Sequence, residues 1–152
     1  MRICFVCYAN ACRSPLAEYL FTDMVKEAGL EDQYEVQSRG MTDVAAGNYV
    51  LPPIQQQLLA HGFGPCGHKA TPLVPEDYAY YDMLVGMDEI NISGMKEIFG
   101  GDPDHKLFKL LSFKGEDRDV ADPWHTDDFE TAWIDVYDGC LALFKKLTEK
   151  AE

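Results

Sequence analysis

A cysteine, an arginine and a serine lie close together near the start of the chain, at Cys7, Arg13 and Ser14. A thiolate is a strong nucleophile, and a guanidinium presents two parallel donors that fit two oxygens of a phosphate. On its own, a cysteine that ends an apolar strand is more often a small buried hydrophobe. The spacing favours the other interpretation, in which Cys7 attacks phosphorus, Arg13 holds the phosphate and Ser14 stabilises the sulfur as it leaves.

The local pattern predicts that these residues lie on a loop between a strand and a helix. Residues 3–6 are an apolar run with a β-branched residue at each end, and Ser14-Pro15 is a typical helix start. Backbone N–H groups in such a loop converge on one point, and the helix dipole makes that point attractive to anions. We therefore expect inorganic phosphate or a similar oxyanion to bind there, and the same field favours the thiolate form of Cys7.

This segment resembles the signature of the low-molecular-weight protein tyrosine phosphatases. The family pattern Cys-x-x-Asn-x-Cys-Arg-Ser-Pro-x-Ala-Glu is matched by Cys7, Asn10, Cys12, Arg13, Ser14, Pro15, Ala17 and Glu18. The resemblance implies that Cys7 is the nucleophile, that Arg13 is the phosphate clamp and that Asn10 braces the loop. It also implies that Tyr8, Ala9, Ala11, Cys12 and Ser14 complete the phosphate-binding loop. A reversible disulfide between Cys7 and Cys12 under oxidation is a further implication.

The departing phenolate oxygen needs an acid to protonate it, and Asp122 is the candidate. Pro123 restricts Asp122 to extended backbone geometry, so we expect its carboxyl to project from a loop instead of capping a helix. The family has its acid in an Asp-Pro-Tyr segment after the fourth strand, which implies this role for Asp122. Trp124 replaces the tyrosine here. It keeps an aromatic cleft wall but removes a phosphorylation site.

A long loop is expected over residues 40–53, because this segment contains turn formers and no period. In the family this loop forms a wall of the substrate cleft and usually carries a tryptophan. This sequence has Val44 at that position, and its only aromatic side chain is Tyr49. We expect Val44, Tyr49 and Trp124 to form the cleft wall, with an altered substrate preference.

A histidine is expected to support the nucleophile loop from behind. His68 lies in the segment His-Lys-Ala-Thr, which is similar to the family's His-x-Ala-Arg, with Thr71 in place of the arginine. The resemblance implies that His68 holds the loop through hydrogen bonds.

Apolar periodicity predicts strands that alternate with helices along the chain. The expected strands cover residues 3–6, 34–40, 82–88 and 107–113, and the expected helices cover 14–28, 53–60, 88–98 and 126–150. In the last helix, Asp127 and Glu130 form the predicted cap, and Cys140 belongs to an inert core stripe. This order predicts an α/β fold: a single domain over residues 1–152 with a doubly wound, four-stranded parallel sheet and helices on both faces.

Composition limits the possible partners and surroundings. The net charge of −13 argues against nucleic acid and anionic membranes, and no apolar stretch is long enough to span a bilayer. Five cysteines, an odd number, suit a reducing compartment, so we expect a cytoplasmic protein. We expect a monomer that acts on tyrosine-phosphorylated proteins without a metal or another cofactor.

Three alternatives use the same residues differently. A structural zinc site would combine Cys4, Cys7, Cys66 and His68, although Cys4 lies inside the apolar strand. A thioredoxin-like protein would have its Cys-x-x-Cys at the helix start, whereas this pair ends where the loop begins. The arsenate reductases of similar fold use a further cysteine pair near residues 80–90, a segment without a thiol here.

Overall fold

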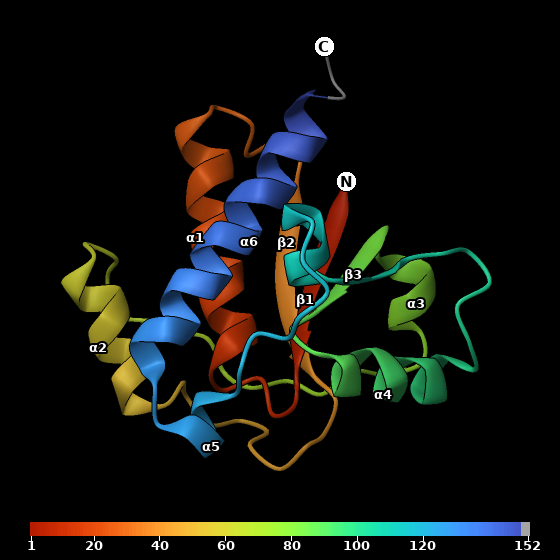
Figure 1. Cartoon of the computed structure of the whole chain (residues 1–152), viewed down its shortest axis with the longest axis horizontal. Helices are drawn as coiled ribbons and strands as arrows, with labels where there is room; N and C mark the ends of the chain where they lie inside the picture. Colours follow the sequence, from red (N-terminus) through yellow and green to blue (C-terminus); the bar gives the residue numbers. More distant parts are fainter. Residues whose placement is uncertain (150–152) are drawn as a thin grey trace.

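Four parallel strands form the centre of the structure, a computed structural model that describes residues 1–149 (Figure 1). The strands are β1 (Arg2–Cys7), β2 (Glu35–Gly40), β3 (Met83–Gly86) and β4 (Leu107–Lys109). Their spatial order is β2-β1-β3-β4, with Cys7 of β1 opposite Gly40 of β2 and Val6 opposite Gly86 of β3. The predicted four-stranded parallel sheet is therefore confirmed.

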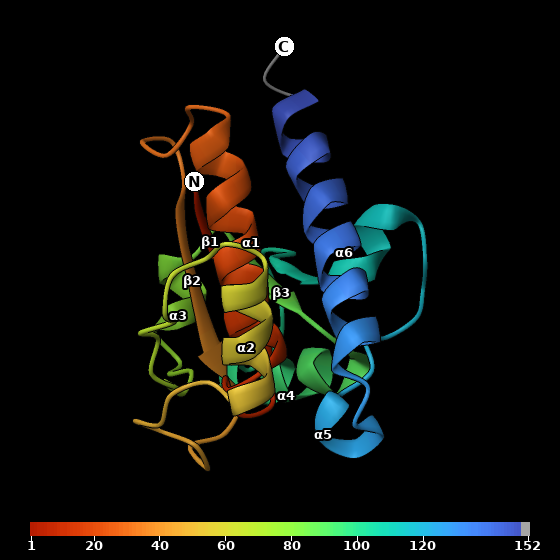
Figure 2. The same ribbon diagram turned by 90° about the vertical axis from the view of Figure 1, so that its left-hand side faces the viewer.

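Helices cover both faces of the sheet, as predicted. They are α1 (Arg13–Glu27), α2 (Pro52–Ala60), α3 (Asp77–Tyr80), α4 (Glu89–Phe99), α5 (Pro123–Thr126) and α6 (Phe129–Glu149). Side chains of β1 alternate between two cores: Ile3, Phe5 and Cys7 pack with α1, α2 and α6, whereas Cys4 and Val6 pack with α3 and α4. Figures 1 and 2 show α1 and α6 on one side of the sheet and α3 and α4 on the other.

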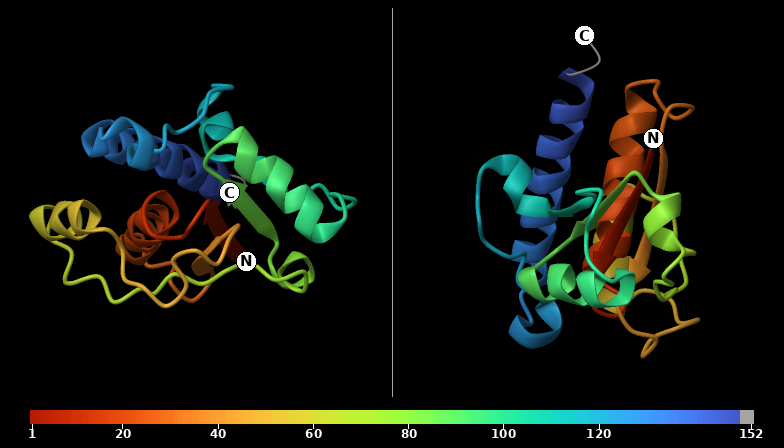
Figure 3. Two further views of the ribbon diagram at one scale, coloured as in Figure 1. Left: turned by 90° about the horizontal axis from the view of Figure 1, so that it is seen from below. Right: turned by 90° about the vertical axis from the view of Figure 1, so that its right-hand side faces the viewer.

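The loop after β1 lies at the point where the chain changes direction across the sheet. From β1 the chain crosses to β2 on one side, and β3 then pairs with β1 on the other side. In open α/β sheets, ligands bind at such a switch point, beyond the carboxyl ends of the strands. Figure 3 (left) looks onto this edge of the sheet.

The fourth strand is shorter than predicted. It ends at Lys109, and residues Leu110–Lys114 form a 3₁₀ helix in place of the expected strand end. Leu110 and Leu111 are fully buried there. A short apolar run is compatible with a buried 3₁₀ turn as well as with a strand, so periodicity alone did not distinguish the two structures.

Helix starts differ from the predictions in two places. Helix α1 begins at Arg13 with Cys12 as its N-cap and no side-chain cap, because the hydroxyl of Ser14 bonds elsewhere. Helix α6 begins at Phe129, where the carboxylate of Asp128, not Asp127, accepts from the backbone N–H of Thr131. The predicted end of this helix at Lys150 lies outside the described residues.

The prediction that Asp122 caps no helix is wrong. The backbone of Asp122 is extended, as Pro123 requires, but its carboxylate accepts from the N–H of Trp124 and caps the short helix α5. A side chain that projects from an extended residue is well placed to do this.

None of the helices within residues 1–149 has the length and apolar character that crossing a membrane requires.

Candidate active site

In the loop from Cys7 to Arg13, carbonyl groups accept hydrogen bonds from neighbouring segments, whereas the N–H groups after Cys7 are left for a ligand. The carbonyls of Cys7, Tyr8, Ala11 and Cys12 accept from the N–H groups of Met41, Thr42, Leu51 and Leu16, respectively. Among the described residues, the backbone N–H groups from Tyr8 to Arg13 donate to no protein acceptor. A run of such N–H groups ahead of a helix is an anion-binding arrangement. The missing side-chain cap of α1 fits it, because a bound anion would take the place of the cap.

Hydrogen bonds behind the loop limit the partners of the Ser14 hydroxyl. The backbone N–H of Thr71 can only donate, so its bond of 2.9 Å identifies the Oδ1 atom of Asn10 as an acceptor. The Nδ2 group of Asn10 then donates to the Ser14 oxygen at 2.8 Å, which leaves the hydroxyl hydrogen of Ser14 for another partner. The sulfur of Cys7 lies 2.9 Å from that oxygen. The carbonyl of Arg39 lies farther from it, at 3.5 Å, so Cys7 is the nearer partner for the Ser14 hydroxyl, and a donor at this place would stabilise a thiolate.

Asn10 is the centre of this network and is fully buried. Its backbone has a φ of 59°, a left-handed conformation that asparagine tolerates better than most residues. Its Nδ2 group also donates to Ser38 at 3.0 Å, and Nε2 of His68 lies 2.8 Å from Oδ1. Because Oδ1 is an acceptor, the Nε2 atom of His68 must carry the hydrogen. His68 thus contacts the loop as the resemblance implies, and its supporting role stays a prediction.

A carboxyl group closes the network on its far side. Glu18 accepts from Ser38 at 2.7 Å, and its Oε1 atom lies 3.6 Å from Nδ1 of His68. Burial raises the pKa of Glu18. Burial also lowers the pKa of His68, with Arg39 as a second cause. Both shifts favour neutral groups behind the loop, because charges are poorly solvated there.

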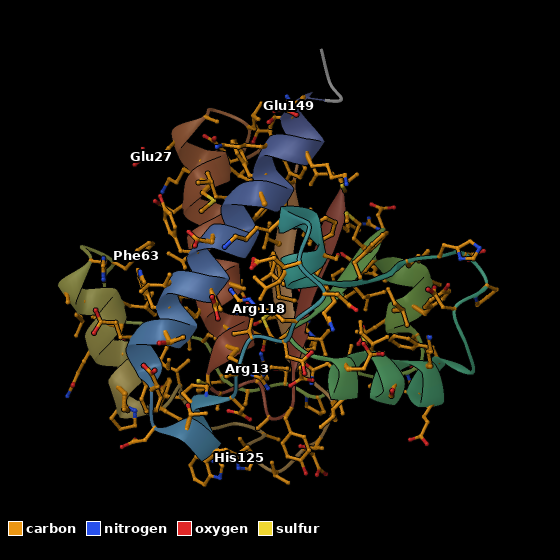
Figure 4. The ribbon with its side chains drawn as sticks, viewed as in Figure 1. Arg13, Glu27, Phe63, Arg118, His125 and Glu149 are labelled. Carbon is orange, nitrogen blue, oxygen red and sulfur yellow. The ribbon has the colours of Figure 1, made fainter. Side chains whose placement is uncertain are left out.

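Arg13 is held by partners from distant parts of the chain. Its NH1 group donates to Asp88 at 2.7 Å and to the carbonyl of Val120 at 2.8 Å, and NH2 lies 3.4 Å from Asp122. Burial opposes the charge of Arg13, but Cys7 and the two carboxylates outweigh it and raise the pKa of the guanidinium. The remaining N–H groups of this fixed fork are available to a phosphate. Figure 4 shows Arg13 near the base of α1, with His125 of α5 below it.

Asp122 is oriented by two contacts. One oxygen accepts from the N–H of Trp124 at 3.0 Å, and the other lies 3.4 Å from Arg13. Asp122 lines the same cleft as Cys7, so a thiol and a carboxyl group border one space. This cleft has a volume of about 730 Å³, which is in the range of sites that bind small organic molecules.

The cleft contains most of the predicted site residues and several that the sequence did not indicate. It is lined by the predicted Cys7, Tyr8, Ala9, Ala11, Cys12, Arg13, Val44, Asp122 and Trp124, and also by Ala45, Asn48, Leu51, Asp88, Ile90, Asn91 and His125. Asn10, Ser14 and His68 lie behind the loop, where they bond to it or to one another.

Tyr49 was predicted as a cleft wall, but it does not line the cleft. It forms a bridge with Lys69, and the ammonium group of Lys69 lies 5.5 Å from the centre of its ring. The loop passes Val44 and Ala45 through the cleft and then turns Tyr49 toward the segment that carries His68. The path of this loop places Tyr49 outside the cleft. Because the loop has no periodic pattern, no local signal in the sequence predicts that path.

Asp88 is the most important residue that the sequence reasoning missed. It was predicted only as a helix start, and it does accept from the N–H of Asn91 in the first turn of α4. Its other oxygen binds Arg13, as described above. Its position at the carboxyl end of a parallel strand beside the switch point was the available signal.

The geometry does not favour the zinc and thioredoxin alternatives. Cys4 and Cys7 belong to the cores on opposite faces of the sheet, so their sulfur atoms cannot act as a pair. All five cysteines are unpaired thiols. Burial raises the pKa of the thiols of Cys4, Cys12 and Cys140 well above the ordinary value. Of these three, only Cys12 lines the cleft with Cys7.

Comparisons with known proteins place the chain in a family. A model of the family described as "Low molecular weight phosphotyrosine protein phosphatase" matches residues 2–152. The phosphatase YfkJ of Bacillus subtilis is 29% identical over 99% of this chain and 97% of its own length. PtpA of Staphylococcus aureus (strain MRSA252), named a low molecular weight protein-tyrosine-phosphatase, is 32% identical over 98% of this chain and 95% of its own length.

Solved structures show the same likeness. The crystal structure of YfkJ superposes with a TM-score of 0.95 at 28% identity and covers 100% of this chain and 97% of its own. The structure of DARP, named a Drosophila arginine phosphatase, has a TM-score of 0.86 at 26% identity and covers 97% and 98%. The resemblance found in the sequence is thereby confirmed, and the chain belongs to the low-molecular-weight phosphotyrosine protein phosphatase family.

Proposed function

We propose that residues 1–152 act as one protein tyrosine phosphatase domain, which hydrolyses phosphotyrosine through a cysteinyl phosphate. One observation carries the proposal: the oxygen of Ser14 lies 2.9 Å from the Cys7 sulfur inside a loop whose N–H groups have no protein acceptor among the described residues. Such a loop stabilises a thiolate and binds the dianion that the thiolate attacks.

In the first step, the thiolate of Cys7 attacks phosphorus in line with the phenolic oxygen. The S–P bond forms as the P–O bond to the tyrosine breaks, and the protonated carboxyl of Asp122 gives its proton to the leaving oxygen. Arg13 and the loop N–H groups neutralise the three other phosphate oxygens. These donors are fixed before substrate binds, so the step needs no metal ion.

In the second step, water attacks the phosphorus of the cysteinyl phosphate. The carboxylate of Asp122 takes a proton from this water, the P–O bond forms and the S–P bond breaks. The electron pair returns to Cys7, where the Ser14 hydroxyl stabilises it. The product is inorganic phosphate, and Asp122 is protonated again for the next cycle.

The cleft walls support phosphotyrosine as the substrate. Trp124, Val44 and Ile90 offer apolar surface to an aromatic ring. DARP is named an arginine phosphatase, so phosphoarginine is the other substrate to test. We further propose that the protein acts as a monomer on phosphoproteins. The odd number of cysteines suits a reducing compartment, so we propose that it acts in the cytoplasm.

The experiment measures turnover of aryl phosphates whose phenols differ in acidity, with a chelator and a reductant present. Cys7→Ser should abolish turnover. Asp122→Asn should lower kcat about a hundredfold or more for weakly acidic phenols and much less for strongly acidic ones, which leave without a proton. Asp127→Asn is the matched control, because Asp127 lies close in sequence but does not line the cleft.

Two results would contradict the proposal. Full activity of Cys7→Ser, or a need for metal, would remove the proposed mechanism. Cleavage of phosphoarginine peptides but not of phosphotyrosine peptides would change the substrate and leave the nucleophile in place.

A further inference from the structure

The mouth of the cleft has an unusual concentration of exposed apolar side chains. Trp124, Ile90 and Val44 are 72%, 68% and 67% exposed, and every other exposed large hydrophobic side chain among the described residues is at most 58% exposed. All three line the cleft that contains Cys7. We call these three residues the apolar rim. Exposed apolar surface gathered at one place marks a binding surface.

The apolar rim is assembled from three separate segments. Val44 lies in the loop after β2, Ile90 in the first turn of α4 and Trp124 in α5. Figure 3 (left) shows these segments at the edge where the strands end: the orange loop, the green α4 and the light-blue α5. Three segments far apart in sequence therefore contribute to one surface.

Two of the rim residues lie close in sequence to the carboxylates that contact Arg13. Ile90 follows Asp88 by two positions, and Asp88 binds Arg13 while it caps α4. Trp124 follows Asp122 by two positions and donates its own N–H to that carboxylate. A substrate whose phosphate lies in the loop is therefore held at a fixed place relative to the rim.

We propose that the apolar rim is a subsite for an apolar side chain next to the phosphotyrosine in the substrate protein. The inference rests on the function proposed above. The substrate's phosphate is bound at the floor and its ring extends outward, so the residues beside the phosphotyrosine reach the mouth of the cleft. Burial of apolar surface there contributes to binding.

Charge limits the flanking residues further. Glu89, which neighbours Ile90, has a side chain that is 67% exposed and lies 3.5 Å from the ammonium group of Lys109. The whole chain carries a net charge of −13. Acidic residues beside the phosphotyrosine would be repelled. Charge therefore makes acidic flanking residues the least preferred, and the apolar rim favours apolar residues over polar uncharged ones.

The test compares phosphotyrosine peptides of equal length that differ only in the two flanking residues: leucine, serine or glutamate. For the wild type, kcat/KM should be about tenfold higher with leucine than with serine, and lowest with glutamate. Ile90→Ser and Val44→Ser should each reduce the leucine preference to about twofold. Ile134→Ser is the control, because Ile134 is half-exposed on α6 and does not line the cleft. It should keep the full preference.

Three outcomes would overturn the inference. The first is equal kcat/KM for all flanking residues, and the second is an unchanged leucine preference in both rim variants. The third is a dimer of the wild type in sedimentation velocity that Ile90→Ser dissociates, with no peptide preference in either protein; the rim would then be a contact between two copies. Failure of every peptide and aryl phosphate would instead contradict the proposed function.

Discussion

The floor and the apolar rim of one cleft are built differently. At the floor, Asn10 is fully buried and each polar atom of its side chain is bonded. One of these bonds goes to the Ser14 oxygen, which lies 2.9 Å from the Cys7 sulfur. At the rim, Ile90 and Trp124 are mostly exposed. A floor that holds a phosphate must be rigid, because misplaced donors lose transition-state stabilisation. A rim that meets varied protein sequences gains from open apolar surface.

Asn10→Ala should cause the largest loss, because it removes the centre of the floor. The change leaves the N–H of Thr71 and the Nε2 group of His68 without their acceptor and puts alanine at a positive φ. We expect a loss of about 3 kcal/mol in the free energy of unfolding and at least a hundredfold loss of kcat, measured by denaturant titration and aryl phosphate turnover. Asn10→Gly also lacks these hydrogen bonds, but it avoids the strain because glycine tolerates a positive φ. If it restored activity, the network would not be what matters.

Gly40→Ala tests how closely the floor is packed. A Cβ atom at Gly40 would lie 2.9 Å from the backbone carbon of Ala9 and 3.1 Å from the backbone nitrogen of Asn10. Neither backbone atom can rotate away, so the loop must shift. We expect a loss of about 2 kcal/mol in stability and about tenfold in kcat/KM. Gly64→Ala is the matched control, because a Cβ atom at Gly64 would meet no other group within 4 Å and the substitution should be nearly neutral.

His68→Gln tests the neutral state of the group behind the floor. Burial lowers the pKa of His68 in the folded protein below the ordinary value of 6.5. The unfolded chain therefore binds more protons below this pH, so stability that is present above pH 6.5 declines as the pH falls toward the folded pKa. Glutamine can still donate to Asn10 but does not titrate.

Denaturant titrations between pH 6 and 8 would check this prediction. The wild type should lose more stability than His68→Gln as the pH falls. Glu18 has the opposite effect: its pKa is raised above the ordinary value of 4.5, so its contribution to stability falls as the pH rises above 4.5. Measurements stay above pH 6 to reduce this contribution. Equal slopes for the two proteins would show that His68 titrates alike in the folded and unfolded states.

Trp124→Ser should have the smallest effect on the fold. The side chain is exposed, and the backbone N–H that orients Asp122 is kept. We expect a change within about 0.5 kcal/mol in stability and a few-fold loss in kcat/KM for phosphotyrosine peptides through KM. A large fall in kcat for poor leaving groups would mean that the indole helps to position Asp122, and the distinction between floor and rim would not hold at this residue.

Short-range signals were enough to predict most of the floor and the order of elements. These features depend on residues that lie only a few positions apart, so local sequence patterns predict them. They are the segment from Cys7 to Ser14, the helix after it and the alternating apolar strands. The same kind of signal was ambiguous for residues 107–113, where an apolar run became a short strand and a 3₁₀ helix.

The sequence by itself determined the parallel sheet, the family to which the chain belongs and the place of the loop from Cys7 to Arg13 between β1 and α1. Only the tertiary structure decided that Asp88 binds Arg13, that Ile90 joins Val44 and Trp124 at the rim and that Tyr49 lies outside it. These pairings join residues far apart in the chain through loops without periodicity. Their geometry depends on how the whole sheet and its helices pack, and no local pattern contains that information.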